Sequence, residues 1–132
     1  MADRGAVLTA MSDFGFGCLG RRFDFAIAQS LFTHLALNSI ARCLIEADAV
    51  LVPGGRLFAT FYENDGGPAA VESRTWKADD GFDFQTHFDR DWYHYVVSDF
   101  EYLCRRTHFT VQSKGEWGHP RRQRMLVFTK GL

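Results

Sequence analysis

The chain has 132 residues, of which 46% are hydrophobic and 15% aromatic, so its composition is that of one globular domain and not of a disordered segment. The formal net charge is -1, from 15 Lys and Arg against 16 Asp and Glu, and this balance indicates neither a nucleic-acid nor a membrane-surface partner. The 3 cysteines form no C-x-x-C pair, so the sequence implies neither a disulfide framework nor a metal site.

Residues 1–22 are weakly patterned and are predicted to be a loop-rich N-terminal segment. Within it, Gly15, Gly17 and Gly20 spell G-x-G-x-x-G. A dinucleotide-binding loop needs such glycines between a strand and the helix whose N-terminus faces the ligand. Because a strand is predicted to follow here, we interpret the glycines as part of a flexible loop.

Residues 23–62 are predicted to form a strand, a helix and a second strand. Phe23 to Gln29 is an apolar run typical of a strand that is buried on both faces. Apolar residues then recur at helical spacing between Ser30 and Val52, and Pro53-Gly54-Gly55 is expected to end that helix. Arg56 to Tyr62 is the second strand, so the segment predicts a parallel crossover unit.

The remainder of the chain divides into two segments. Residues 63–97 are predicted to be an insertion or a substrate-side segment, with a hairpin that turns at Asp79-Asp80-Gly81. In residues 98–132, the spacing of Ser98 and Glu101 fits a capping box and predicts a helix that runs from there to about Thr107. Two alternating strands, Phe109–Lys114 and Arg124–Lys130, are expected to pair in the antiparallel direction.

The order of these segments resembles the C-terminal part of a class I S-adenosylmethionine-dependent methyltransferase domain. The resemblance rests on FDFAIAQSLFTHL, on LVPGGRLFATF and on WGHP before RMLVF, and it covers residues 12 to 130 or so. It implies an α/β fold with a partial, mixed Rossmann-like sheet, flanking helices and a C-terminal antiparallel strand pair. The family's glycine-rich cofactor loop is not found, so residues 1–132 are expected to be a single truncated domain.

The resemblance implies that S-adenosylmethionine is the cofactor and that Asp13, Phe14, Gln29 and Ser30 face it. Asp13 and Phe14 take the place of the family's adenine contact, and a solvated turn is the alternative for Asp13. Gln29 and Ser30 end the first predicted strand, and ligands bind at the carboxyl ends of strands in open parallel sheets. The alternative for these two residues is a polar strand end with a helix cap.

Four more residues are candidates for the substrate side. His34 follows the same strand end, and an imidazole accepts a proton near neutral pH, so His34 is the candidate catalytic base; a structural histidine is the alternative. By resemblance, Tyr93, His94 and His119 edge the substrate pocket. For these three, the alternative is aromatic packing and a turn histidine.

Two residues depart from the family's pattern. Asp48 stands where the family's helix places a small or apolar residue toward the sheet. Because an unpaired buried carboxylate is costly, Asp48 is expected to be paired, exposed or protonated. His108 takes the place of a common glycine, and a histidine adopts positive φ less freely than glycine.

Two functions from different classes remain open. The first is a methyltransferase that acts on an unidentified acceptor, with a small molecule favoured. The second is a non-catalytic methyltransferase remnant that acts as an oligomerising or interaction module. Without the family's first strand, the apolar edge at residues 23–29 is unpaired. We expect residues 5–11, a second copy in a homodimer or a partner chain to cover it.

The sequence also predicts a cytoplasmic protein with no membrane partner. No apolar run approaches the ~20 residues of a membrane span. The charged residues at the N-terminus are followed by no apolar core, so a signal peptide is not expected.

Overall fold

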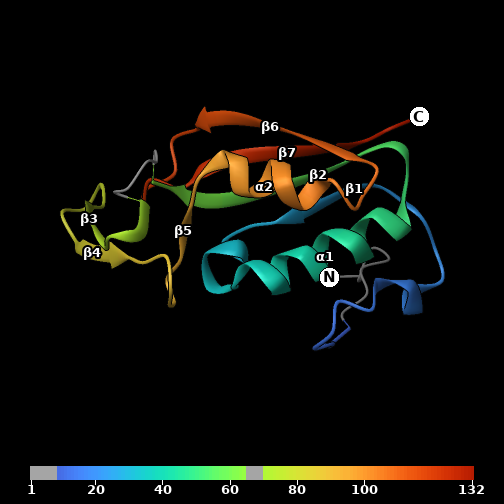
Figure 1. The fold of residues 1–132 in the computed structure, drawn as a ribbon, viewed down its shortest axis with the longest axis horizontal. Helices are drawn as coiled ribbons and strands as arrows, with labels where there is room; N and C mark the ends of the chain where they lie inside the picture. Colours follow the sequence, from blue (N-terminus) through green and yellow to red (C-terminus); the bar gives the residue numbers. More distant parts are fainter. Residues whose placement is uncertain (1–8, 65–69) are drawn as a thin grey trace, which may run out of the picture.

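The computed structural model describes residues 9–64 and 70–132 as a mixed α/β fold. The elements in chain order are η1 (Phe16–Leu19), β1 (Phe23–Ala28), η2 (Phe32–His34), α1 (Leu37–Val50), β2 (Leu51–Glu63), β3 (Arg74–Lys77), β4 (Asp83–Thr86), β5 (His94–Tyr95), α2 (Val97–Cys104), β6 (Phe109–Glu116) and β7 (Arg124–Lys130). Figure 1 shows the long strands side by side, the helices α1 and α2 packed beside them, and the β3–β4 hairpin at one end.

The main sheet has the strand order β1-β2-β7-β6, with β5 pairing to the end of β2. β1 and β2 are parallel, as expected for two strands joined by a helix, and Ala28 lies opposite Ala59. β7 is antiparallel to both β2 and β6. The predicted mixed sheet with a C-terminal antiparallel strand pair is therefore confirmed.

The first predicted helix is shorter than expected, and the prediction for Pro53-Gly54-Gly55 was wrong. A turn and η2 precede α1, which ends at Val50. Leu51 already pairs with Phe23, and the three residues lie inside β2 as a bulge. Both glycines are needed there, since Gly54 has a φ of 82° and a Cβ on Gly55 would lie 2.8 Å from the carbonyl oxygen of Val52.

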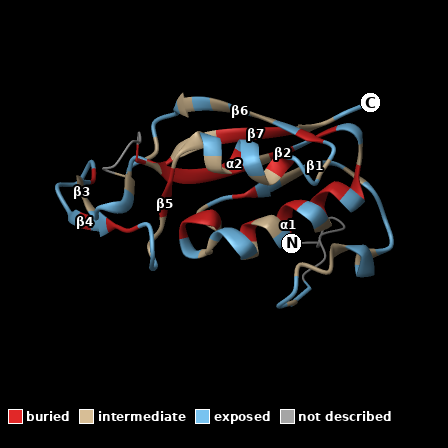
Figure 2. Ribbon diagram, in the orientation of Figure 1, coloured by how far each residue is buried: buried red, intermediate tan, exposed pale blue. Residues whose placement is uncertain are grey.

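The hydrophobic core lies between the sheet and the two helices. Figure 2 shows buried residues along β2 and β7 and on the inner faces of α1 and α2. Phe100 of α2 is fully buried, and its ring lies 5.2 Å from that of Phe61 and 6.2 Å from that of Phe128. These aromatic contacts fix the second helix on the sheet.

The predicted hairpin at Asp79-Asp80-Gly81 is confirmed. β3 and β4 pair in the antiparallel direction, and Gly81 takes a φ of 86° in the turn. The hairpin packs on the end of β2 through a second, smaller cluster, in which the rings of Trp76 and Phe84 lie 5.7 Å and 5.4 Å from the ring of Tyr62. The hairpin thus covers the end of β2 that carries the polar pocket described below.

The predicted cap of the second helix was wrong. α2 begins at Val97, so Ser98 lies inside it, and the helix ends at Cys104 instead of near Thr107. The carboxylate of Asp99 accepts a hydrogen bond from the backbone N–H of Val96 at 3.1 Å. Asp99 sits in the first turn, where a negative charge also interacts favourably with the helix dipole.

Asp48 is buried and paired, as expected. Its Oδ2 accepts hydrogen bonds from the backbone N–H of His108 at 3.1 Å and from Nδ1 of His108 at 3.0 Å. The ammonium group of Lys130 lies 3.7 Å from the other carboxylate oxygen. Within the described ranges, the non-glycine residues with positive φ are Phe14, Ser30 and Arg122, so His108 does not adopt the glycine conformation.

Candidate functional site

A polar pocket lies where the carboxyl ends of β1 and β2 meet. Its volume is about 340 Å³, and the residues that line it are Ser30, Thr33, His34, Tyr62, Trp92, His119, Arg121 and Gln123. Three of the predicted site residues, Ser30, His34 and His119, are thus brought together from segments far apart in the sequence. The position at the carboxyl ends of parallel strands is where α/β sheets bind ligands.

The floor of this pocket is a connected set of hydrogen bonds. Ser30 has a φ of 55°, and its backbone N–H donates to Oγ1 of Thr60 at 2.7 Å. The hydroxyls of Ser30 and Thr60 both donate to Oε1 of Gln123, at 3.1 Å and 2.6 Å. The amide nitrogen of Gln123 in turn lies 3.4 Å from the hydroxyl of Tyr62. The turn after β1, the strand β2 and the loop before β7 are therefore held in one arrangement.

Tyr62 is the buried phenol of this network. Burial raises its pKa, although the hydrogen bond from Gln123 and the charge of Arg121 act in the opposite direction. The hydroxyl therefore stays protonated near neutral pH and can donate or accept a hydrogen bond inside the pocket.

His34 forms a pair with Asp91 at the mouth of the pocket. Its Nδ1 lies 2.8 Å from a carboxylate oxygen of Asp91, and both side chains are about half exposed. Because the carboxylate can only accept, Nδ1 of the neutral ring carries the proton and Nε2 keeps a free lone pair. The edge of the ring also meets Trp92 at 6.1 Å. A base oriented by a third group is an arrangement that proton-transfer sites use.

His119 and Arg121 supply hydrogen-bond donors to the same pocket. Nδ1 of His119 accepts the backbone N–H of Arg121 at 3.0 Å, so the neutral ring carries its proton on Nε2. Burial lowers the pKa of His119, and the charge of Arg121 lowers it further. The guanidinium of Arg121 lies 4.7 Å from the ring centre of Phe82, which is a cation–π contact.

Two predicted substrate residues do not line this pocket. His94 is 2% exposed, and both ring nitrogens are used: Nδ1 lies 2.8 Å from Oγ1 of Thr86, and Nε2 lies 2.8 Å from the carbonyl oxygen of Ala70. The ring of Tyr93 stacks on Tyr95 at 5.9 Å. Both side chains are thus placed by packing and internal hydrogen bonds, which matches the alternative stated for them from the sequence.

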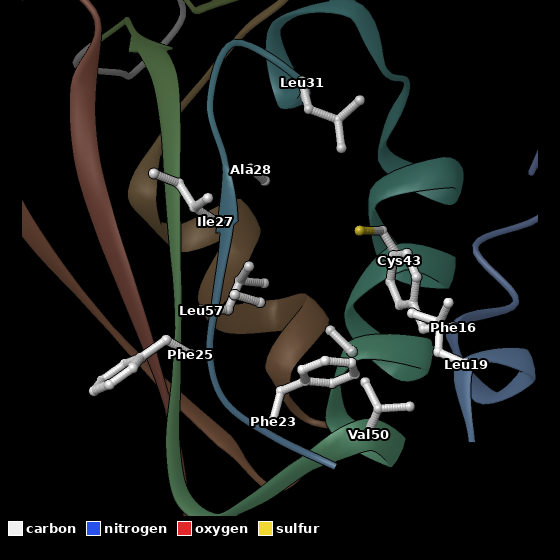
Figure 3. A pocket seen from close by; sticks show the side chains of 12 residues that line it. Phe16, Leu19, Phe23, Phe25, Ile27, Ala28, Leu31, Cys43, Val50 and Leu57 are labelled. Atoms are coloured by element: carbon white, nitrogen blue, oxygen red, sulfur yellow. The ribbon is translucent and has the colours of Figure 1, made fainter. Parts of the chain in front are cut away.

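The predicted cofactor residues belong to two segments of the chain, one before η1 and one after β1. Asp13 caps Gly15, whose N–H donates to its carboxylate at 3.0 Å, and the ring of Phe14 packs against Phe16 at 6.2 Å. Figure 3 places Phe16 of η1 against the C-terminal half of α1, whereas Gln29 and Ser30 follow the opposite end of β1. Phe16 and Leu31, which are sequence neighbours of these residues, line the same apolar hollow, so the cofactor role of Asp13, Phe14, Gln29 and Ser30 stays a prediction.

The glycine triplet does not open an α-helix. Its residues form η1, and Gly20, with a φ of 66°, leads into β1. The segment is thus a short 3-10 turn that packs on α1, and no strand-to-helix phosphate loop is formed from it. In the part of the chain that the structure describes, there is also no group of three or more His, Cys, Asp or Glu side chains that could hold a metal ion.

A second hollow, of about 270 Å³, lies beside β1 and is almost entirely apolar. Figure 3 shows Phe25 and Ile27 pointing away from α1, whereas Leu31, Phe16 and Leu19 lie on the side of that helix. Phe25 is 63% exposed and Ile27 is 69% exposed. Residues 5–11 were one candidate to cover this edge of β1, and residues 5–8 among them lie outside the described residues. Among the described strands, only β2 pairs with β1.

Among the described residues, no helix is both long and apolar enough to cross a membrane. The described cysteines, Cys18, Cys43 and Cys104, are all free. Burial raises the pKa of the Cys43 thiol to about 11, and that of Cys104 to about 11 as well, so neither is a reactive thiolate at neutral pH.

No family model and no curated protein matches the chain. Solved structures do match it. A methyltransferase from Methanosarcina mazei is 16% identical, with a TM-score of 0.51 over 83% of this chain and 59% of that one. Magnesium protoporphyrin IX methyltransferase from Synechocystis, with bound S-adenosylhomocysteine, is 14% identical, with a TM-score of 0.57 over 91% of this chain and 49% of that one.

A third match is 1,6-didemethyltoxoflavin-N1-methyltransferase from Burkholderia thailandensis, at 19% identity and a TM-score of 0.51. The similarity covers 84% of this chain and 45% of that protein. The chain thus spans less than two thirds of the length of each of these three proteins. Likeness at such identities concerns the fold and not the reaction. The chain therefore has the fold of part of a class I S-adenosylmethionine-dependent methyltransferase.

Proposed function

We propose that this chain is the acceptor-binding part of an S-adenosylmethionine-dependent methyltransferase that acts on a small molecule. The observation that carries the proposal is the His34–Asp91 pair at the mouth of the polar pocket, 2.8 Å between the two atoms. The solved structures named above are methyltransferases, among them a magnesium protoporphyrin IX methyltransferase and a 1,6-didemethyltoxoflavin-N1-methyltransferase with 1,6-didemethyltoxoflavin bound. A base beside a pocket at the strand ends suits an acceptor that must lose a proton.

The proposed division of the chain follows from this site. Residues 1–132 act as one methyltransferase-like domain, in which residues 23–62 carry the pocket floor and residues 63–97 cap it. Trp92 supports the role of the cap, because it lines the pocket and also packs in the hairpin's aromatic cluster. Residues 98–132 contribute His119, Arg121 and Gln123 from the loop before β7.

We propose that the cofactor lies at the carboxyl end of β1. Gln29 is exposed, and Ser30 beside it forms the turn with a φ of 55° that ends β1. We propose that these two residues face the cofactor. The glycine triplet does not fit its methionine part, because it packs on α1 at the other end of β1. Asp13 and Phe14 lie beside that triplet, and their contact with the adenine of the cofactor stays a proposal from the resemblance.

In the proposed reaction, the acceptor hydroxyl donates its proton to Nε2 of His34. Asp91 accepts the hydrogen bond from Nδ1–H and stabilises the imidazolium that results. When bound, S-adenosylmethionine would supply the methyl group on a sulfonium, and the acceptor oxygen would take that methyl group while the electron pair of the broken C–S bond stayed on the sulfur. The pocket floor acts by orienting the acceptor, which is the main protein contribution to such a displacement.

Calorimetry with S-adenosylmethionine and an assay of methyl transfer to phenolic acceptors test this proposal. Binding tighter than about 1 mM supports a cofactor role. Replacing the base, His34→Gln, is expected to lower the rate by about 100-fold or more, whereas His108→Gln, a histidine outside the pocket, should leave the rate unchanged. No binding heat and no transfer at high protein concentration would contradict the proposal.

We also propose that a second copy of the chain covers the edge of β1. Supporting observations are the exposed Phe25 and Ile27 and the apolar hollow beside them. The other edge strand, β6, is protected differently, since it carries the exposed residues Thr110, Gln112 and Lys114. This edge is the observation that favours the interaction-module function over a purely catalytic one.

Sedimentation of the purified chain tests this second proposal. The chain is expected to be a dimer that Ile27→Lys dissociates, because a charge on an exposed apolar edge opposes strand pairing. The matched control is Thr110→Lys on the opposite edge strand, which should leave the dimer intact. A monomer whose amides at residues 23–29 exchange rapidly with solvent would refute the proposal.

We infer a cytoplasmic, reducing location as a further proposal. Its support is the set of free thiols, among which Cys18 is exposed. An exposed free thiol persists more readily where thiols are kept reduced.

A further inference from the structure

The polar pocket presents acceptor and donor groups from different segments of the chain. Nε2 of His34 is a hydrogen-bond acceptor because Nδ1 donates to Asp91 at 2.8 Å. The ring of His119 presents Nε2–H because its Nδ1 is already an acceptor, at 3.0 Å from the backbone nitrogen of Arg121. A ligand that satisfies both groups carries a proton donor and a separate hydrogen-bond acceptor.

Arg121 adds a positive charge that nothing in the described chain neutralises directly. The neighbouring Arg122 pairs with Asp79 at 3.1 Å, and Arg124 pairs with Glu63 at 2.9 Å. Among the described residues, no carboxylate forms such a pair with Arg121, which lines the pocket and lies over Phe82. The carboxylate of Asp91 is engaged by His34, and that of Asp79, which lies close enough to His119 to raise its pKa, is engaged by Arg122. The pocket is therefore suited to an anion.

Two aromatic side chains also line the pocket, and the space is small. Trp92 and Tyr62 line the pocket between the histidines. A volume of about 340 Å³ lies at the lower end of the range for ligand sites, so it suits one or two rings better than a long chain. Aromatic faces favour a planar ligand.

We propose that the methyl acceptor is a small aromatic hydroxy acid, whose hydroxyl binds at Nε2 of His34 and whose carboxylate is held by Arg121 and Nε2–H of His119. This assignment rests on the proposed methyltransferase function and names its substrate class. Arg121 is the specificity residue, because a guanidinium binds a carboxylate through charge-assisted hydrogen bonds that a neutral analogue cannot match.

The test uses 4-hydroxybenzoate as the probe and 4-hydroxybenzamide as its neutral counterpart, titrated into the full chain without cofactor. Binding is followed by calorimetry and by the indole N–H signal of Trp92 in ¹⁵N spectra. The acid is expected to bind to the wild type, and Arg121→Gln is expected to weaken it by about tenfold or more through loss of charge-assisted hydrogen bonds. The amide should bind weakly and respond little to that change.

Arg122→Gln is the matched control, because Arg122 is adjacent in sequence but pairs with Asp79 and does not line the pocket. It should leave binding of the acid unchanged. Arg121→Lys, which keeps the charge, should recover part of the affinity and guards against a variant that fails to fold. Equal binding of acid and amide, equal effects of the two arginine changes, or no binding of the acid would overturn the proposal.

The two proposals fail in different ways. If the acid binds through Arg121 but is not methylated in the presence of S-adenosylmethionine, the substrate-site assignment stands and the methyltransferase function fails. If methyl transfer occurs only to neutral phenols and does not depend on Arg121, the methyltransferase function stands and the acceptor class is wrong.

Discussion

The side chains of the polar pocket come from positions far apart in the chain. His34 lies just after β1, and Asp91, its partner, is 57 residues further along. Gln123 reaches Ser30 across 93 positions. Each of these contacts depends on the sheet order, so the site exists only in the folded chain. At the scale of single residues, the central question is which hydrogen bonds fix each imidazole.

The first prediction concerns the tautomer of His34. With Asp91 in place, Nδ1 should carry the proton, since it faces a carboxylate oxygen at 2.8 Å. Asp91→Ala should shift the neutral ring toward the Nε2–H form and remove the base position. Long-range ¹H–¹⁵N spectra of the imidazole measure this directly. An unchanged pattern of nitrogen shifts in the variant would show that Asp91 does not orient the ring.

The second prediction concerns pH. Burial lowers the pKa of His94 and of His119, so below the ordinary value the unfolded chain binds more protons than the folded chain. The free energy of unfolding should therefore decrease as the pH falls from about 7 to about 5. Urea unfolding across this range measures the slope.

The matched variants are His94→Gln and His119→Gln, each of which should make that slope shallower. His119→Gln is the milder change, because His119 is only partly buried, whereas His94 bonds Thr86 and Ala70. A slope that is unaffected by both replacements would assign the pH dependence to other groups.

Individual pocket residues were only partly predictable from sequence. Ser30 and His34 follow a strand whose end is recognisable, and His119 belongs to a segment that carries the resemblance. Asp91 and Arg121 gave no local signal, because Asp91 lies among other charged residues and Arg121 in a short basic cluster. Their roles depend on which groups face them across the fold. His94 is the opposite case, since the sequence marked it as a candidate but its ring is buried. Its two nitrogens are already hydrogen-bonded to a hydroxyl and to a backbone carbonyl.

At the scale of elements, α2 is short, and Phe100 is its fully buried aromatic residue in the core. Phe100 is fully buried and its ring contacts the rings of Phe32, Phe61 and Phe128. A helix of this length is marginal by itself, so most of its stability comes from this packing.

The third prediction follows from that packing. Phe100→Ala should lower the free energy of unfolding by about 3–5 kcal/mol, through lost burial and the cavity left behind. Tyr102→Ala on the same helix is the control, because Tyr102 is 65% exposed and its loss should cost about 0.5 kcal/mol or less. Chemical denaturation measures both values. Similar losses for the two variants would contradict the described core.

The elements differ in how far local sequence determines them. The β3–β4 hairpin and the strand pair β6–β7 follow from turn residues and alternation, and both were predicted. Pro53-Gly54-Gly55 was interpreted as a helix stop, because proline and glycine commonly end helices. Its actual place inside β2 depends on the pairing of Leu51 with Phe23, a long-range contact that no local pattern encodes.

At the scale of the whole molecule, the fold class was predictable because the order of strands and helices is itself a constraint. A strand, helix and strand make a parallel pair, and the final two strands add an antiparallel pair at the other edge. The position of η1 was not predictable. Phe16 and Leu19 of η1 line the apolar hollow beside β1 and α1, and no local pattern encodes this contact.

The central claim is that cofactor and acceptor meet at the carboxyl ends of β1 and β2. Titration of the ¹⁵N-labelled chain with S-adenosylhomocysteine tests it most directly, because backbone amide shifts locate the ligand whether or not transfer occurs. We expect the amide signals of Gln29 and Ser30 to shift first, with further shifts that extend to Tyr62. Shifts confined to another surface, or none at about 1 mM ligand, the range of weak specific binding, would contradict it.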